Sequence, residues 1–275
     1  MNIRSFLIIS CLFFLSWCTT KPFDVEQNVI DGTGRFLHDV IVVAHVGAPY
    51  EATYNSLAWF ALAKKYWADA VEFDVSLTKD NQTIVMHGPS MEMNSTCQHP
   101  MKNVADYTLA EIKEDCKLNN GEPIRSLEEM LSEIKGRFAY YFIEMKVYDE
   151  HKISLQADDI AAVIKKLWLG VKAIVTSYDH DALAKIVEQW IMWWRDTYTL
   201  SEFYHVDSFA YPYFLVDFRE LQKEPVLIDR LRGKFVAYTA SDVKQFKQIY
   251  DMGVRIIMTD DIKNTMHYVL SGDTY

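Results

Sequence analysis

The sequence predicts an α/β protein whose parallel strands close into a (β/α)8 barrel, and three observations support this. Apolar, strand-like segments alternate with helical segments along the chain, which is the order of elements in a parallel sheet. About eight such strands occur in a chain of 275 residues, and a barrel of this kind needs roughly 250. The segment after the first strand, 45–55, contains a single glycine, whereas an open doubly wound sheet usually has a glycine-rich loop there.

Each element follows from its pattern of apolar and capping residues. Buried strands are predicted over 39–46, 69–77, 83–87, 138–146, 172–178, 234–240 and 254–260, and weaker strands over 196–200 and 213–218. Helices are predicted over 55–67, 126–136, 156–168, 180–194 and 241–253. The first of these helices has Asn55 or Ser56 as its N-cap, and the long connection 88–122 holds one short helix at 108–116.

The composition fits a large globular domain and argues against a nucleic-acid-binding protein. Half of the residues are hydrophobic, which supplies a sizeable core, and the formal net charge is −10. An acidic surface repels nucleic-acid phosphates, and no basic run offsets this repulsion. An anionic substrate would therefore need local positive charge from a metal ion or from a few lysine and arginine side chains.

The first residues have the pattern of an export signal. Arg4 precedes an apolar stretch over 6–17, which has the length of a signal-peptide core and is short for a membrane span. Cys18 follows, and the segment resembles a bacterial lipoprotein signal whose cysteine carries a lipid anchor. An ordinary cleaved signal and an uncleaved anchor are the alternatives. The predicted organisation is a signal over 1–18, a tether over 19–37 and one barrel domain over 38–275, exported to the periplasm or attached to the envelope.

Export would leave two cysteines in the mature domain, Cys97 and Cys116. Both lie in the loop-rich connection 88–122, where they are able to close a disulfide in an oxidising compartment. Two free thiols are the alternative that the sequence leaves open.

Polar side chains interrupt the strands near their carboxyl ends, where the active sites of (β/α)8 barrels lie. Glu72 and Asp74 are one residue apart in a buried strand, so their side chains point to the same face. Burying two like charges is unfavourable unless a cation compensates them. Glu144 and Lys146 have the same spacing at the end of a later strand, and we expect them to join the same site.

Two histidines, His45 and His87, end two further strands. Each feature alone has a simpler interpretation, namely a structural histidine, a solvated strand edge or a local ion pair. Their convergence at one end of one barrel favours a catalytic site. Carboxylates without cysteine partners suit Mg²⁺ or Ca²⁺, and two histidines suit a general acid and a general base. This combination predicts cleavage of a phosphodiester, with Lys146 holding a non-bridging oxygen.

In these residues the chain resembles the glycerophosphodiester phosphodiesterase family, metal-dependent barrels of the phospholipase-C-like phosphodiesterase type. The matching segments are "AHVGA" (44–48), "YNSLAWF" (54–60), "VEFDVSLTKDNQTIVMHG" (71–88), "FIEMK" (142–146) and "GVRIIMTDD" (253–261). They occur in the family's order over about residues 38–262, which makes the resemblance more specific than any single motif.

The resemblance implies a role for each candidate residue. His45 and His87 would be the acid–base pair. The ligands of one Ca²⁺ or Mg²⁺ ion would be Glu72, Asp74 and Glu144, and Lys146 would contact the substrate. The implied reaction hydrolyses a small-molecule glycerophosphodiester to an alcohol and glycerol 3-phosphate.

Four positions depart from the family's motifs. Val46 replaces the arginine that follows the first histidine, Thr53 and Tyr54 replace a proline and a glutamate, and Gly88 replaces the aspartate after the second histidine. Glu51 is a candidate to replace the lost glutamate. These departures keep two alternatives open: an enzyme of the sphingomyelinase D type, similar to a phospholipase D, that acts on lysolipids, and a catalytically degenerate barrel that binds a lipid headgroup.

Overall fold

The computed structural model describes residues 39–45, 51–189, 191–197, 214–226, 228 and 235–271. The predicted signal and tether over 1–37, with the lipidation site Cys18, lie outside the described residues, and so does Val46. Within the described ranges, no helix is both long enough and apolar enough to cross a membrane.

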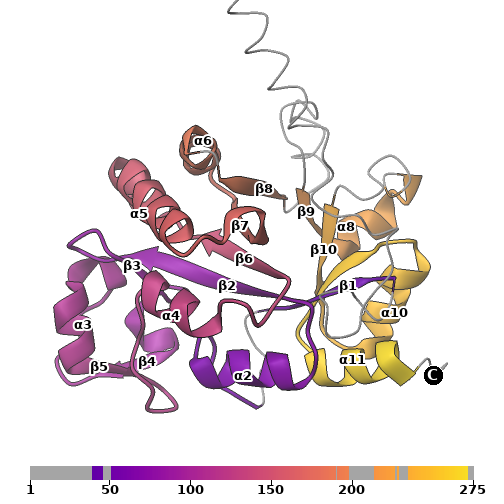
Figure 1. Ribbon diagram of the computed structural model, residues 1–275, viewed down its shortest axis with the longest axis horizontal. Coiled ribbons are helices and arrows are strands. Elements are labelled where there is room, and N and C mark those ends of the chain that lie inside the picture. The colour runs from indigo at the N-terminus through magenta and orange to yellow at the C-terminus, as the bar shows by residue number, and fades with distance from the viewer. Residues whose placement is uncertain are drawn as a thin grey trace, which may run out of the picture.

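In the part of the chain that the structure describes, eight parallel strands form the predicted barrel (Figure 1). They are β1 (Ile41–Ala44), β2 (Ala70–Leu77), β6 (Tyr140–Met145), β7 (Ala173–Ser177), β8 (Met192–Thr197), β9 (Phe214–Asp217), β10 (Phe235–Ala240) and β11 (Ile256–Thr259). Each pairs with the next in this order, and β11 pairs with β1, so the sheet closes on itself. A short strand, β3 (Thr83–Val85), runs antiparallel to the end of β2. The predicted fold class is confirmed.

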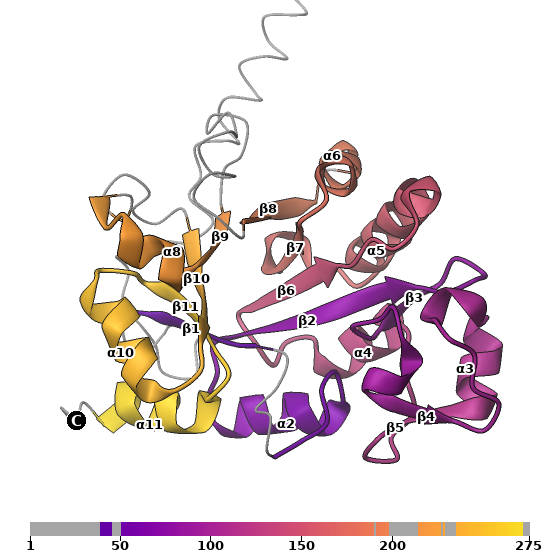
Figure 2. The same cartoon turned by 180° about the vertical axis from the view of Figure 1, so that it is seen from behind.

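Helices cover the outside of the sheet, and both views place α5 and α6 on one side of it and α2 and α11 on the other (Figures 1 and 2). The described α-helices are α2 (Leu57–Lys65), α3 (Leu109–Asp115), α4 (Leu127–Ile134), α5 (Ile153–Lys166), α6 (His180–Glu188), α8 (Phe218–Lys223), α10 (Val243–Asp251) and α11 (Ile262–Ser271). Of the two predicted caps of α2, Ser56 is the one used, because its side chain accepts a hydrogen bond from the Trp59 N–H.

Side chains alternate across the barrel wall and separate an inner apolar layer from an outer core. In β1, Ile41 and Val43 belong to the inner layer, together with Ala70 of β2 and Phe142 of β6. The residues between them along each strand pack against the helices in the main core. The same alternation decides which polar side chains reach the interior.

The connection 88–122 folds as a small unit beside β3 (Figure 1). Besides the predicted helix α3, it contains a two-stranded antiparallel sheet of β4 (Ser95–Cys97) and β5 (Cys116–Leu118), which the sequence pattern did not predict. A disulfide joins Cys97 to Cys116 across these two strands, so of the two alternatives that the sequence left open, the bridge is the one present. Closing a loop of this length contributes about 3 kcal/mol to stability.

One predicted boundary is wrong. The helix expected over 180–194 ends at Glu188, and the strand expected over 196–200 is instead β8, Met192–Thr197. A short apolar run such as "IMWW" is compatible with either a helix or a strand, and periodicity alone does not distinguish them. Parallel pairing with β7, in which Ile174 lies opposite Met192, decides for the strand. Helices α8 and α11 were not predicted.

Asp69 precedes β2 and contacts β1 at the point where these two strands pair. Its carboxylate accepts a hydrogen bond of 2.8 Å from the Val42 N–H, beside the Val43–Ala70 pair that closes the barrel. Burial raises the pKa of Asp69 to about 8, and the Val42 N–H and the charge of Lys64 oppose this only in part. Asp69 is therefore protonated in the folded protein at pH values where it is ionised in the unfolded chain.

We expect Asp69 to make the folded state less stable as the pH rises from about 4 to about 8. A carboxyl group whose pKa is higher in the folded state contributes stability that is complete below its unfolded pKa and is lost as the pH passes its folded pKa. The free energy of unfolding of the wild type relative to Asp69→Asn should fall by roughly 5 kcal/mol across this window, because each pH unit between the two pKa values changes it by about 1.4 kcal/mol. Urea denaturation at several pH values measures this difference, and a pH-independent difference would contradict the assignment.

Candidate active site

Three carboxylates, those of Glu72, Asp74 and Glu144, form one group on the inner face of the barrel wall, here called the carboxylate cluster. The alternation that places Ala70 and Phe142 inside the barrel continues along β2 and β6 to these residues. Asp74 lies opposite Glu144 in the parallel β2–β6 pairing. One oxygen of each carboxylate lies within 4.8 Å of the other two. Glu72 and Asp74 are only 2% and 1% exposed, so their charges are held away from water.

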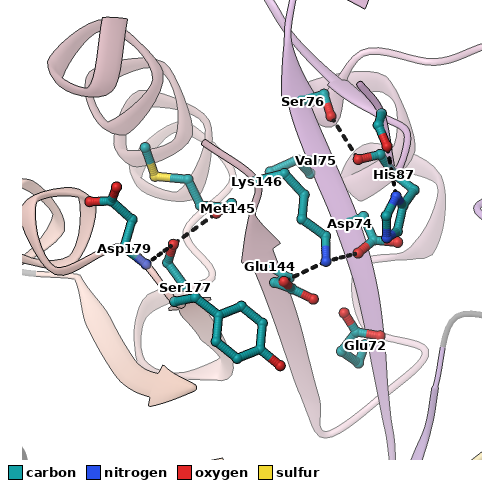
Figure 3. Close-up of polar contacts among 12 residues, drawn as sticks. Glu72, Asp74, Val75, Ser76, His87, Glu144, Met145, Lys146, Ser177 and Asp179 are labelled. Atoms are coloured by element: carbon teal, nitrogen blue, oxygen red, sulfur yellow. Dashed lines mark hydrogen bonds and ion pairs between the residues drawn. The ribbon is translucent and has the colours of Figure 1, made fainter. Parts of the chain in front are cut away.

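Lys146 lies against the carboxylate cluster (Figure 3). Its Nζ is 2.5 Å from Oε1 of Glu144 and 3.2 Å from Oδ1 of Asp74. Burial favours the neutral amine, but the charges of Asp74 and Glu144 outweigh it and raise the pKa of Lys146 well above its usual value. Burial, and after it the charge of Asp74, raise the pKa of Glu144.

The carboxylate cluster suits a divalent cation. With Lys146, the three carboxylates carry a formal charge of two negative units, which one divalent ion balances. Oδ1 of Asp74 is buried, and Nζ of Lys146, 3.2 Å away, supplies one positive charge against the three carboxylates. Carboxylate oxygens are the ligands that hard cations prefer. The acidic residues therefore fit a metal ion as the sequence predicts.

His45 follows the last residue of β1 and faces the carboxylate cluster. Its backbone N–H donates to the Thr259 carbonyl at 3.0 Å, which extends the β1–β11 pairing by one residue. On the ring, Nδ1 lies 2.7 Å from Oδ1 of Asp260, and Nε2 lies 3.8 Å from Oε2 of Glu72. An ionised carboxylate only accepts hydrogen bonds, so Nδ1 carries a proton and donates it to Asp260. The other nitrogen, Nε2, then faces the cluster and is the one able to exchange a proton.

His87 follows β3, and the Met86 N–H donates to the Asp74 carbonyl at 3.1 Å, which brings this segment next to the cluster. Figure 3 shows the His87 ring beside Asp74. Nδ1 of the ring lies 2.7 Å from the Gly88 carbonyl oxygen, which is an acceptor, so Nδ1 is the donor. As in His45, Nε2 is left for proton exchange.

Gly88 occupies a position that excludes a side chain, which accounts for the departure from the family's aspartate. Its φ is +59°, a left-handed conformation that suits glycine. A Cβ there would lie 2.6 Å from Oγ of Ser76 and 2.9 Å from a ring carbon of Tyr148. Both neighbours hold the His87 carbonyl oxygen, since Ser76 donates to it at 3.2 Å and Tyr148 at 2.6 Å.

We expect Gly88→Ala to destabilise the protein by about 1–3 kcal/mol and to lower kcat by displacing His87. Gly121→Ala is the matched control, because Gly121 also has a positive φ but no atom lies within 4 Å of its would-be Cβ. The control should lose some stability and keep the wild-type kcat. Thermal unfolding and steady-state kinetics of both variants test this, and a wild-type kcat for Gly88→Ala would contradict it.

Glu51, the candidate to replace the glutamate that the family has at the position of Tyr54, contacts two outer helices. Its carboxylate accepts hydrogen bonds from the Tyr66 hydroxyl at 2.7 Å and from Nζ of Lys263 at 3.1 Å. These contacts tie the connection after β1 to helices α2 and α11. The contacts of Glu51 in this structure are therefore with α2 and α11, and not with the carboxylate cluster.

The six candidate residues meet at the same end of the barrel, as expected from the sequence, while their individual roles stay predictions. Two further residues touch them and were missed. Asp260 was noted only as part of the closing motif, although an acidic residue directly after the last strand was a signal that it reaches the same end of the barrel. Asn55 is a predicted helix cap and part of the matching segment 54–60, and its side chain hydrogen-bonds to Asp74, a contact that the sequence did not predict.

Comparison with known proteins decides the family. The model of the glycerophosphoryl diester phosphodiesterase family matches residues 45–264, which is most of the chain and begins at His45. The chain belongs to this family. The resemblance inferred from the sequence motifs is therefore confirmed, and the fold and the family are those of a phosphodiesterase.

Individual members of the family are only distantly similar in sequence. The glycerophosphodiester phosphodiesterase of Bacillus subtilis is 29% identical, in a match that covers 54% of this chain and 55% of that protein. The chain thus spans about half the length of this relative. The glycerophosphodiester phosphodiesterase of Caldanaerobacter subterraneus is 26% identical, and the match covers 84% of this chain and 98% of that protein. A phosphodiesterase structure from Oleispira antarctica, in complex with the product sn-glycerol-3-phosphate, shares the fold with a TM-score of 0.71 and 19% identity, over 82% of this chain and 95% of that one.

Proposed function

We propose that this protein hydrolyses glycerophosphodiesters to an alcohol and glycerol 3-phosphate. Family membership supports the reaction class, and the relative that matches over most of both chains carries the corresponding name. The observation that carries the proposal is the position of the carboxylate cluster, which His45 faces and to which the β3–His87 segment is hydrogen-bonded. A site with both metal ligands and two proton-exchanging groups suits phosphodiester hydrolysis.

The cation is proposed to be Ca²⁺ or Mg²⁺, held by Glu72, Asp74 and Glu144. When bound, it would supply positive charge that stabilises the phosphoryl oxygens in the transition state. Lys146 would contact a non-bridging oxygen of the phosphate as a second positive charge. Its contacts with Glu144 and Asp74 keep the ammonium group at the same wall of the barrel.

The two histidines are proposed to move the protons of the reaction. Nε2 of one ring would take the proton of the glycerol 2-hydroxyl as it attacks phosphorus, and the other ring, as an imidazolium, would give its Nε2 proton to the leaving alcohol oxygen. Water would then open the cyclic phosphate to glycerol 3-phosphate, with the two proton transfers reversed. Asp260 would hold His45 in the tautomer that exposes Nε2, and the Gly88 carbonyl would do the same for His87. The P–O bond to the alcohol breaks, and the phosphate stays on the glycerol.

Product analysis with pure substrates tests the proposal. We expect glycerophosphocholine, incubated with the protein and Ca²⁺ or Mg²⁺, to give choline and glycerol 3-phosphate, detected by mass spectrometry. Lysophosphatidylcholine and sphingomyelin are the comparison substrates. Cleavage of these lipids without cleavage of several glycerophosphodiesters would favour the sphingomyelinase D type, and no turnover of any substrate would favour a binding protein.

We also propose that the protein is exported and held at the bacterial envelope through Cys18. The Cys97–Cys116 disulfide supports export, because disulfides persist mainly in oxidising compartments. Cell fractionation of the full chain and of Cys18→Ser tests both parts. Release of the variant from the membrane fraction would support the lipid anchor, and recovery of both forms from the cytoplasm would contradict export.

A further inference from the structure

We infer that Asn55 is a positioning residue for the metal site: it holds the carboxylate of Asp74 so that one of its oxygens is directed to the cation. The inference rests on the proposed function in that Asp74 is taken as a metal ligand. It goes further by giving a role to a residue that lies in the connection before α2 and is not itself a ligand in the proposed site.

Asn55 makes two hydrogen bonds to Asp74. Its Nδ2 donates to Oδ2 of Asp74 at 3.3 Å, and its Oδ1 accepts from the Asp74 backbone N–H at 3.4 Å. Asn55 is 1% exposed, so little water competes for these groups. Its φ is +58°, a left-handed conformation that asparagine tolerates better than most residues.

These bonds occupy a break in the sheet. On the side of β2 that faces β1, pairing with β1 ends at the Ala44–Val71 pair, and pairing with β3 begins only at Val75. The backbone N–H of Asp74 lies in the interval between the two partners. The side-chain amide of Asn55 fills this interval, because it satisfies the N–H that a neighbouring strand would otherwise bind.

The two oxygens of Asp74 are thereby made unequal. Oδ2 accepts from Asn55, while Oδ1 accepts no bond from Asn55 and lies 3.2 Å from Nζ of Lys146. Without the Asn55 side chain, the Asp74 carboxylate would be able to rotate about its Cβ–Cγ bond. Groups that orient a metal ligand in this way typically change metal affinity by about 10–100-fold when they are removed.

The test uses Asn55→Gly, because glycine adopts the same positive φ without strain and removes only the side-chain amide. Asn94→Ala is the matched control: Nδ2 of Asn94 donates to the Tyr54 carbonyl at 2.7 Å and so anchors the same connection without touching Asp74. Isothermal titration calorimetry of the metal-free proteins with Ca²⁺ or Mg²⁺ alone measures affinity. We expect a loss of about 10–100-fold for Asn55→Gly and less than about threefold for Asn94→Ala.

Kinetic measurements distinguish a misoriented Asp74 carboxylate from a general loss of structure around the site. For Asn55→Gly, the metal concentration that gives half-maximal activity should rise with the calorimetric constant, while kcat at saturating metal stays within about threefold of the wild type. Equal loss of affinity in both variants, or wild-type affinity in Asn55→Gly, would overturn the inference while leaving the proposed function intact. A wild-type protein that binds neither ion would overturn the metal site and this inference together.

Discussion

Replacing either His45 or His87 by alanine is expected to lower kcat by about 10²–10⁴-fold while the protein stays folded. Each ring has one nitrogen held by a fixed acceptor, Asp260 or the Gly88 carbonyl, and one nitrogen directed to proton exchange. Alanine removes that second nitrogen. Neither ring is part of the apolar core, and His45 is 31% exposed, so the cost in stability should be small. Glycerol 3-phosphate release at saturating substrate measures kcat, and thermal unfolding reports the fold.

The chain offers a matched control for this experiment. His99 also forms a histidine–aspartate pair, with Nδ1 2.7 Å from Oδ1 of Asp115, but it is 88% exposed on the unit formed by 88–122. His99→Ala should keep the wild-type kcat. Asp260→Asn should lower kcat, because an amide permits the wrong tautomer of His45. Wild-type turnover in either alanine variant of the proposed acid–base pair would make that assignment wrong.

Removing the divalent ion is expected to lower kcat/KM by about 10³-fold or more, since the charge that a metal supplies to a phosphoryl transition state is worth several kcal/mol. The carboxylate cluster with Lys146 keeps two formal negative charges, and these would repel an anionic phosphodiester if no cation were bound. Activity after treatment with EDTA, and its recovery on adding Ca²⁺ or Mg²⁺ in separate titrations, measures the effect. Full activity in EDTA would contradict a metal-dependent reaction.

Glu72→Gln tests whether the divalent ion is bound by the carboxylate cluster. Glutamine keeps the size of the side chain and removes one negative charge, so the affinity for the ion should fall by at least about 100-fold. Glu128→Gln is the control, because Glu128 forms an exposed ion pair with Lys166 on the outer helices. The control should bind the ion as the wild type does. Equal affinities in both variants would place the metal elsewhere.

Local pattern was enough to predict most of the strands and the face on which the acidic residues lie. Alternation in 69–77 places Glu72 and Asp74 on one side of β2, and the same rule applied to 138–146 places Glu144 and Lys146 together. A spacing of two residues within a strand is a property of the extended backbone. It therefore does not depend on what surrounds the strand.

The boundary near residue 190 could not be predicted in the same way. The run "IMWW" (191–194) continues the apolar pattern of α6, yet its last three residues lie in β8 because their backbone pairs with β7. Hydrogen bonds to a neighbouring strand come from residues distant in the chain, and a short window of sequence contains no information about them. The antiparallel pair of β4 and β5 was not predicted for the same reason.

The sequence by itself determined the kinds of side chain that the site contains and the strand face that each occupies. Only the tertiary structure decided which faces meet. The β2–β6 register sets Asp74 opposite Glu144, and closure of the barrel brings Asp260 to His45 across 215 residues of chain. Asn55 reaches Asp74 because β1 stops pairing with β2 before that residue. Local backbone geometry sets the direction of each side chain. Contact between residues that are distant in the chain requires the closed sheet, because the register of its strands sets the distance between them.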